Sequence, residues 1–269
     1  MTRPVVAILT DFGTADHYVG AMKGVILSIC PDATLVDLTH DVPAHDVMAG
    51  ALELAACWRF FRPGTIFLAV VDPGVGTSRG GLVAEAGGAR FVAPDNGLLT
   101  AVFDECPPSR VVALTDARYR RPVVSKTFEG RDRFAPAAGW LAAGVAPDAF
   151  GDSLDGAIRL ALPRPIEEDG RISGCVLTVD RFGNLITNIR RDALDRLGPG
   201  STLRVSIGQT PVGAWVDTYA EAMPGETCAL VGSTDRLEIA VNGGRAVDRT
   251  GAGRGTAVTV VRLSAAMVR

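Results

Sequence analysis

Residues 5–10 read VVAILT and lead directly into Asp11. An unbroken run of apolar and β-branched residues of this length is typical of a strand buried on both faces of a sheet. Similar runs recur at 34–38, 65–71 and 110–114, with helical patterns between them. Because strands that alternate with helices form parallel sheets covered on both faces, the sequence predicts an α/β domain with a largely parallel, helix-flanked sheet.

The expected helices of this domain lie between the strand runs, and the last of them carries Pro136 in its first turn, where a missing N–H costs nothing. They cover residues 20–30, 46–60, 96–104 and 134–143. A glycine-rich stretch at 80–92 predicts a hairpin-like region. We place this N-terminal domain at residues 1–162.

After the Pro- and charge-rich stretch 162–170, LPRPIEEDG, the pattern changes. Short β-patterned runs broken by glycine replace the alternation of strands and helices. They cover residues 172–179, 184–189, 201–207, 227–231, 236–241 and 256–263. Consecutive short strands of this kind predict a smaller antiparallel β domain, a barrel or a sandwich, at 171–269.

The composition of the 269 residues is that of an ordered globular protein, with 47% hydrophobic and 21% charged residues. The formal net charge is -3 and the basic residues are scattered, so no nucleic-acid partner is expected. The five cysteines form no CxxC pair, which favours reduced thiols. No apolar run reaches the length of a membrane span, and the first is too short for a signal peptide. We therefore expect a soluble, cytoplasmic protein without a membrane partner.

Acidic residues follow the expected strands: Asp11 the first, Asp37 and Asp41 the second, Asp72 the third. Ligands of parallel α/β sheets bind beyond the carboxyl ends of the strands, so these carboxylates mark a candidate site. Each Asp also suits a turn or a helix cap, which is the structural alternative. Together the four could hold Mg²⁺, which would indicate a metal-dependent hydrolase of a nucleotide.

The loop VDPGVGT at 71–77 combines a Pro with two Gly directly after a buried strand. These residues fix a tight turn whose backbone can approach a ligand closely. Its glycine spacing differs from the dinucleotide-binding pattern, and no helical pattern follows it. A nicotinamide-cofactor site is therefore not expected here.

Six motifs, spread in order along nearly the whole chain, resemble those of one family. They are TDFGT at 10–14, ICP at 29–31, VDPGVGT at 71–77, PDNGLL at 94–99, TFEGRD at 127–132 and FGNLITNI at 182–189. The sequence is similar to the S-adenosyl-L-methionine (SAM) hydroxide adenosyltransferases, the adenosine-forming SAM hydrolases, whose relatives include fluorinase and chlorinase.

The resemblance implies an N-terminal α/β domain, a C-terminal β-barrel domain and a homotrimer. The active sites would lie between the N-terminal domain of one subunit and the C-terminal domain of the next. It also implies the reaction, in which water or hydroxide attacks the ribose C5′ of SAM and releases adenosine and methionine without a cofactor. Methionine leaves as a neutral thioether, so this reaction needs no general acid.

The resemblance further implies which residues hold the adenosine part of SAM. Asp11 would bind the ribose hydroxyls, because a carboxylate accepts hydrogen bonds from two neighbouring O–H groups. Asn184 would read the adenine edge with its amide, beside Phe182 of the same motif. Tyr219 would stack on the adenine, although an isolated aromatic residue is equally typical of a core.

For the methionine part, the resemblance implies two residues of the C-terminal domain. Ser233, in the sequence GST at 232–234, would hold the carboxylate, and Asp180 would bind the ammonium group. Surface turn and hairpin roles are the structural alternatives for both residues.

Asp72 and Arg79 are expected to carry the chemistry. Asp72 stands where the halogenating relatives carry Tyr, and a carboxylate repels halide but accepts a proton from water. Arg79 matches the pattern of the hydrolases and would pair with Asp72 or stabilise hydroxide. The resemblance therefore favours hydroxide over halide as the nucleophile.

Glu129 departs from the family pattern, which has His at this place in a T-F-H-G-R-D motif. Ionised Glu accepts hydrogen bonds but donates none, and it adds a second negative charge near Asp72. We expect Glu129 to orient and deprotonate water as a third catalytic residue, with Arg79 and Arg131 balancing its charge. A site that binds SAM or adenosine without turnover is the alternative.

Overall fold

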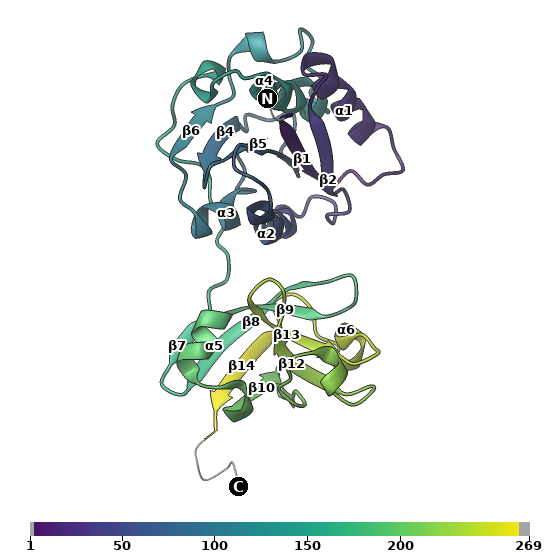
Figure 1. Ribbon diagram of the computed structural model, residues 1–269, viewed down its shortest axis with the longest axis vertical. Helices are drawn as coiled ribbons and strands as arrows, with labels where there is room; N and C mark the ends of the chain where they lie inside the picture. Colours follow the sequence, from purple (N-terminus) through teal and green to yellow (C-terminus); the bar gives the residue numbers. More distant parts are fainter. Residues whose placement is uncertain (1–2, 264–269) are drawn as a thin grey trace. The chain divides into compact units, whose positions relative to one another are not determined.

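The computed structural model describes residues 3–263, so the ends of both expected domains, at 1–2 and 264–269, lie outside the described residues. The chain divides into two compact units, Met1–Leu162 and Pro163–Arg269 (Figure 1). The first unit is an α/β fold and the second is a curled antiparallel sheet. The expected fold class, an N-terminal α/β domain followed by a smaller antiparallel β domain, is confirmed.

A six-stranded sheet with the order β2-β1-β3-β5-β4-β6 forms the centre of the first unit. Its strands are β1 (Val5–Thr10), β2 (Thr34–Thr39), β3 (Ile66–Val70), β4 (Gly81–Ala86), β5 (Ala89–Pro94) and β6 (Arg110–Ala113). The pairs β1–β2, β1–β3 and β3–β5 are parallel, whereas β4 is antiparallel to both of its neighbours. The glycine-rich stretch forms the β4–β5 hairpin.

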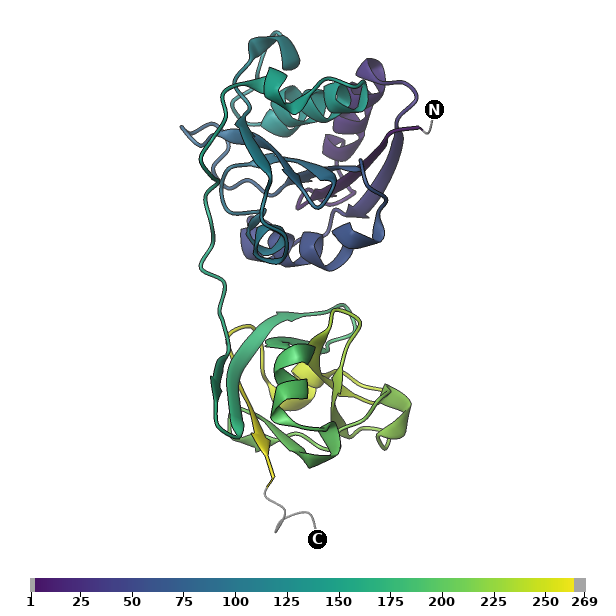
Figure 2. The ribbon, with the colours of Figure 1, turned by 60° about the vertical axis from the view of Figure 1, so that its left-hand side comes forward.

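Helices cover both faces of this sheet, as Figures 1 and 2 show. They are α1 (Tyr18–Ile29), α2 (Val47–Cys57), α3 (Thr100–Glu105) and α4 (Ala135–Ala142). Alternate residues of β1 point to opposite faces: Val6 and Ile8 pack in the core beneath α1 and α4, and Ala7 and Leu9 in the core beneath α2 and α3. This double burial explains why the strand is apolar from Val5 to Leu9.

Two local features around the helices differ from the sequence expectation. Helix α3 begins at Thr100 rather than at residue 96, because Gly97 has φ +93° and the Asn96 side chain bonds to backbone groups. A π-helical turn, η3 (Gly130–Phe134), precedes α4 and was not expected from the sequence.

The strand directions bring several loops to one edge of the sheet. β1, β2, β3 and β5 run in the same direction, so their carboxyl ends share that edge. β4 runs in the opposite direction and begins there, with Gly81 paired to Pro94. Asp72, just after β3, and Arg79, just before β4, therefore lie at the same edge as Asp11.

The second unit contains an eight-stranded antiparallel sheet with the order β11-β10-β14-β8-β9-β13-β12, in which β7 also pairs with β8. Its strands are β7 (Ile166–Glu168), β8 (Arg171–Val179), β9 (Leu185–Arg190), β10 (Leu203–Ile207), β11 (Thr210–Pro211), β12 (Thr227–Val231), β13 (Arg236–Val241) and β14 (Ala257–Arg262). The sheet curls around one core, and a bridge from Trp215 to Ala229 links the segment after β11 to β12.

Two strands and two α-helices of the second unit were missed by the sequence analysis. One of the strands, β11, has only two residues. β7 lies inside the Pro- and charge-rich stretch 162–170. Two short helices, α5 (Arg191–Leu197) and α6 (Ala246–Thr250), place Ala193, Leu194 and Ala246 in the core. Each helix is only one or two turns long, which leaves too few residues for a helical period to stand out.

Within residues 3–263, no helix is both long and apolar enough to cross a membrane. All five cysteines carry free thiols, with Cys30 and Cys228 buried.

Candidate functional site

The loop between β3 and β4 holds Asp72 and Arg79 against each other. Arg79 Nε donates to Asp72 Oδ1 at 3.0 Å, and Arg79 Nη2 donates to Asp72 Oδ2. The third nitrogen of the guanidinium, Nη1, donates to the carbonyl oxygen of Gly80 at 2.8 Å. Both side chains are nearly buried, with exposed fractions of 5% for Asp72 and 8% for Arg79. This bidentate contact therefore fixes the Asp72 carboxylate in one orientation.

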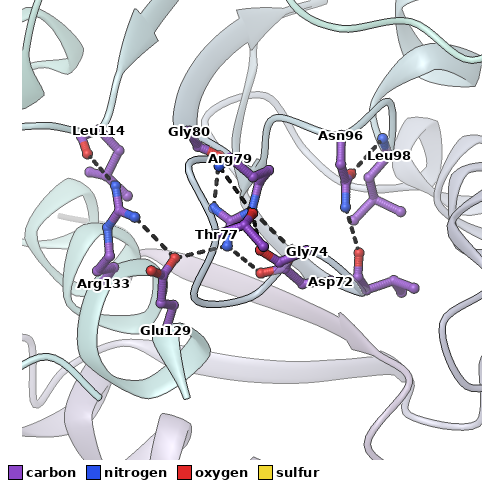
Figure 3. A network of polar contacts seen from close by, with 11 residues as sticks. Asp72, Gly74, Thr77, Arg79, Gly80, Asn96, Leu98, Leu114, Glu129 and Arg133 are labelled. Atoms are coloured by element: carbon purple, nitrogen blue, oxygen red, sulfur yellow. Dashed lines mark hydrogen bonds and ion pairs between the residues drawn. The ribbon is translucent and has the colours of Figure 1, made fainter. Parts of the chain in front are cut away.

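Glu129, which directly precedes the π-helical turn η3, joins this pair from the neighbouring segment. Arg79 Nη2 donates to Glu129 Oε2 at 2.8 Å, and Arg133 Nη1 donates to the same oxygen at 3.0 Å (Figure 3). Asp72, Arg79, Glu129 and Arg133 thus form a row of alternating negative and positive groups. The row has no net charge, which lowers the cost of burying it.

Close packing between β4 and η3 makes this row possible. The Phe134 ring lies beneath Arg79, with the guanidinium carbon 5.3 Å from the ring centre. A Cβ on Gly81 would come within 2.6 Å of the same ring, so only glycine admits Phe134 there. Asn96, in the segment after β5, contacts the segment after β3, because its Nδ2 donates to the carbonyl of Val71 at 2.9 Å.

Burial raises the pKa of Asp72 above its usual range, and the negative charge of Glu129 acts in the same direction. The hydrogen bonds and charge of Arg79 oppose this rise without cancelling it. A raised pKa makes Asp72 a better proton acceptor near neutral pH than an ordinary carboxylate.

Gly76 allows the Asp72–Arg79 loop to approach the segment that leads to Glu129. Its φ is +78°, and a Cβ there would lie 2.3 Å from the carbonyl oxygen of Lys126. We expect Gly76→Ala to strain the backbone by about 1–2 kcal/mol and to cost about 1–3 kcal/mol more through this overlap. Because the loop must move away from Lys126, catalytic efficiency should fall as well.

Gly64→Ala is the matched control for this prediction. Gly64 has a similar φ of +84°, but nothing lies within 4 Å of an added Cβ. Urea unfolding should show the backbone cost alone for Gly64→Ala and a larger loss for Gly76→Ala. Equal losses in the two variants would show that the approach to Lys126 does not matter.

Asp11 lies at the same sheet edge but outside the row of four charges. Its Oδ2 accepts from the backbone N–H of His45 at 2.8 Å. The neighbouring Thr10 is anchored by His40, whose Nδ1 lies 2.8 Å from Thr10 Oγ1. These contacts hold the loop after β1, and within residues 3–263 no hydrogen bond uses the second oxygen of Asp11.

Three of the four acidic residues of the Mg²⁺ cluster considered above, Asp11, Asp37 and Asp72, have other partners. Asp37 contacts Lys23 at 2.6 Å and His40 at 2.9 Å, and Asp72 is held by Arg79. In the part of the chain that the structure describes, no three His, Cys, Asp or Glu side chains are grouped to hold a metal ion.

In the second unit, Asp180 and Asn184 form one compact turn between β8 and β9. Asp180 Oδ1 accepts from the Asn184 backbone N–H at 2.8 Å, and Oδ2 accepts from Asn184 Nδ2 at 3.0 Å. The second contact sets the direction of the Asn184 amide group. Phe182, at the tip of this turn, is 75% exposed.

Tyr219 contacts a buried carboxylate that the sequence analysis missed. Its hydroxyl donates to Glu238 Oε1 at 2.6 Å. Burial raises the pKa of Glu238, the Tyr219 hydrogen bond opposes the rise, and the nearby charge of Asp180 adds to it. Asp180, Tyr219 and Glu238 therefore lie close enough to influence one another, whereas Ser233 is exposed in the turn between β12 and β13.

Arg133 is the second residue missed by the sequence analysis, which expected Arg131 to balance Glu129. Arg131 instead donates to both oxygens of Asp132, at 2.7 and 2.8 Å, and its guanidinium lies over the Phe128 ring. The spacing of four residues between Glu129 and Arg133 was the available signal, because residues four apart are neighbours on a helix.

Comparisons with known proteins identify the family of this chain. The SAM hydroxide adenosyltransferase N-terminal domain model matches residues 6–151, and the C-terminal domain model matches residues 174–259. A Salinispora tropica protein named (R)-S-adenosyl-L-methionine hydrolase is 40% identical, with 92% of this chain and 94% of that protein covered. An Actinoplanes protein named fluorinase is 33% identical, with 74% of this chain and 76% of that protein covered.

A solved structure of an uncharacterised conserved protein from Thermotoga maritima is also similar to this chain. Its TM-score is 0.91 at 35% identity, with 96% of this chain and all of that chain covered. The two family models span most of the sequence and match the two units separately. The chain therefore belongs to the SAM hydroxide adenosyltransferase family, as the sequence motifs predict.

Proposed function

We propose that this protein hydrolyses SAM to adenosine and L-methionine by in-line attack of water or hydroxide on the ribose C5′. The observation that carries the proposal is the Asp72 carboxylate, fixed by Arg79 at the ligand-binding edge of the sheet with Glu129 beside it. Relatives named (R)-S-adenosyl-L-methionine hydrolase, at 37–40% identity, support the same reaction.

The reaction makes modest demands on the protein. The water oxygen forms a bond to C5′ while the C5′–S bond breaks, and the electron pair of that bond stays on sulfur. Sulfur changes from a sulfonium to a neutral thioether, so the leaving group requires no proton. The protein must align the water, limit its contact with bulk solvent and accept one proton from it.

Two carboxylates can orient one water molecule by accepting both of its hydrogens. Asp72 is the proposed proton acceptor, since its raised pKa suits proton transfer near neutral pH. Glu129 directs Oε2 to the two arginines, and among residues 3–263 no hydrogen bond uses its Oε1. With Oε1 as the second acceptor, a lone pair of the water would face C5′.

Residues of both units would bind the substrate. Asp11 would bind the ribose hydroxyls, and Asn184, Phe182 and Tyr219 would bind the adenine. Asp180 and Ser233 would bind the ammonium and carboxylate of the methionine part. In this proposal the first unit would supply the reacting groups, and the second would supply most of the binding groups.

Because the reacting groups and most of the binding groups belong to different units, a complete site requires residues from both units. We propose a cytoplasmic homotrimer with active sites at the subunit interfaces. Its mass in solution, measured by sedimentation, tests the assembly directly.

Product analysis tests the reaction. Purified protein is incubated with SAM in buffer, in EDTA, and with added chloride or fluoride, and the products are separated by chromatography. We expect adenosine and methionine in equal amounts, unaffected by EDTA or halide. A halogenated adenosine would identify a halogenase, and loss of activity in EDTA would indicate a metal-dependent reaction. Unchanged SAM with binding visible by calorimetry would identify the protein as a binding protein.

A further inference from the structure

Arg133 is anchored at both ends of its guanidinium. Nη1 donates to Glu129 Oε2 at 3.0 Å, and Nη2 donates to the backbone carbonyl of Leu114 at 2.9 Å. Figure 3 shows it reaching from η3 between these two groups. The side chain is only 17% exposed and Glu129 is 10% exposed. Arg133 is thus a fixed positive charge, held by Leu114, the residue after β6, as well as by Glu129.

We propose that Arg133 is a positioning residue that makes Glu129 usable at this place, so that the two residues act as one unit. This inference rests on the proposed hydrolysis of SAM. It extends that function by naming the residue that compensates for the departure from the family's His.

Charge balance is the first argument for the pair. Without Arg133, the two carboxylates of Asp72 and Glu129 would share the single guanidinium of Arg79 in a nearly buried site. Like charges at short range disfavour the state in which both are ionised. Arg133 restores neutrality to the row, which lowers the cost of burying the two carboxylates side by side.

Geometry is the second argument. Arg79 and Arg133 approach the same oxygen of Glu129 from two directions, which leaves the carboxylate little freedom to rotate. Its other oxygen, Oε1, is then held in one place. Because small displacements of a positioned group lower catalysis strongly, loss of Arg133 should affect kcat more than KM.

The pairing also predicts how a histidine would behave here. An imidazole between two guanidinium groups cannot take a positive charge easily, and it cannot accept two hydrogen bonds on one nitrogen as Oε2 does. Glu129→His, although it restores the family's residue, should therefore be poorly active while Arg133 is present. Removing Arg133 as well should improve that variant.

The experiment measures SAM hydrolysis by the full-length wild type and by Arg133→Met, Arg133→Lys, Glu129→His and Glu129→His/Arg133→Met. Arg133→Met should lower kcat by about 10- to 100-fold with little change in KM, and should move the acid limb of the kcat profile to higher pH. Arg133→Lys, which keeps the charge, should recover part of the lost activity. The double variant should exceed Glu129→His by about 10-fold.

Arg196→Met is the matched control, because Arg196 forms the same four-residue pair with Asp192, at 3.0 Å, on an exposed helix face. It should leave kcat and the pH profile unchanged. If Arg133→Met lowers only the thermal midpoint, or if the double variant is no better than Glu129→His, the positioning role is wrong while the hydrolase function stands. A wild type without turnover overturns the proposed function and this inference together.

Discussion

Asp72→Asn should lower kcat for SAM hydrolysis by about 10²- to 10⁴-fold, the range for loss of a positioned general base. Asparagine keeps the size of the side chain and one oxygen that can accept from Arg79. It lacks the negative charge and cannot take a proton from water. Arg79 also keeps its bonds to Glu129 and Gly80, so the loop should remain folded. The rate of adenosine release measures the effect, and SAM affinity by calorimetry separates it from binding.

Asp116→Asn provides the control for Asp72→Asn. Asp116 also accepts from an arginine, with Arg118 Nε at 3.0 and 3.1 Å from its two oxygens, but it is far less buried and belongs to no part of the proposed site. Its replacement should leave turnover at the wild-type rate. An Asp72→Asn variant that keeps more than about a tenth of the wild-type kcat would remove Asp72 as the general base.

Alanine variants of the same site separate the two carboxylates. If Asp72→Ala is inactive and Glu129→Ala retains the wild-type rate, Glu129 takes no part in the mechanism. A loss in both, with the smaller loss in Glu129→Ala, agrees with one carboxylate that accepts the proton and a second that orients the water.

The position of the site at the sheet edge could be predicted from the sequence. Runs of buried residues at 5–10 and 65–71 identify parallel strands, and parallel strands end at a common edge. Asp11 and Asp72 follow two of these strands, so their placement follows from topology alone.

The contacts of Arg79 depend on features that strand patterns do not contain. Arg79 reaches the edge only because β4 runs antiparallel to β5 and begins there. Its contact with Glu129 requires Phe134 to pack against β4, which in turn requires Gly81. Packing between segments fifty residues apart is not visible in any local periodicity.

Which of Arg131 and Arg133 contacts Glu129 depends on the local backbone conformation. The sequence offers two arginines around Asp132, and either could reach Glu129 if the local backbone were unknown. The π-helical turn decides between them, since it pairs Arg133 with Glu129 and leaves Arg131 to Asp132. The spacing of four residues favours Arg133 only if residues 129–133 are helical, and π-helical turns are rare.

Glu238 was missed for a related reason. In β13 it alternates with Leu237 and Ile239, which is the pattern of a strand with one solvent-facing side. A small apolar cluster that includes Val216 and Ala222 covers this face, so Glu238 is only 5% exposed. Long-range coverage of a strand face cannot be read from the strand itself.

Arg79→Met should destabilise the first unit by about 3–5 kcal/mol near neutral pH, the cost of leaving buried charges without their partner. The substitution keeps the aliphatic volume over Phe134 but removes the guanidinium that joins Asp72 to Glu129. Two carboxylates then face each other with only Arg133 to balance them. Equilibrium urea unfolding measures the loss, and Arg118→Met, at an exposed Asp–Arg pair, should show no comparable change.

The pH dependence of this loss has a definite sign. The pKa of Asp72 already lies above its unfolded value because burial and Glu129 outweigh Arg79, and removing Arg79 raises it further. The folded protein then binds this proton more tightly than the unfolded chain, so ionised Asp72 costs stability above its folded pKa. That cost shrinks as the pH falls through the folded pKa toward the unfolded one. The stability gap between wild type and Arg79→Met should therefore narrow on acidification, and a gap that stays constant or widens would show that Arg79 does not hold Asp72 in its ionised form.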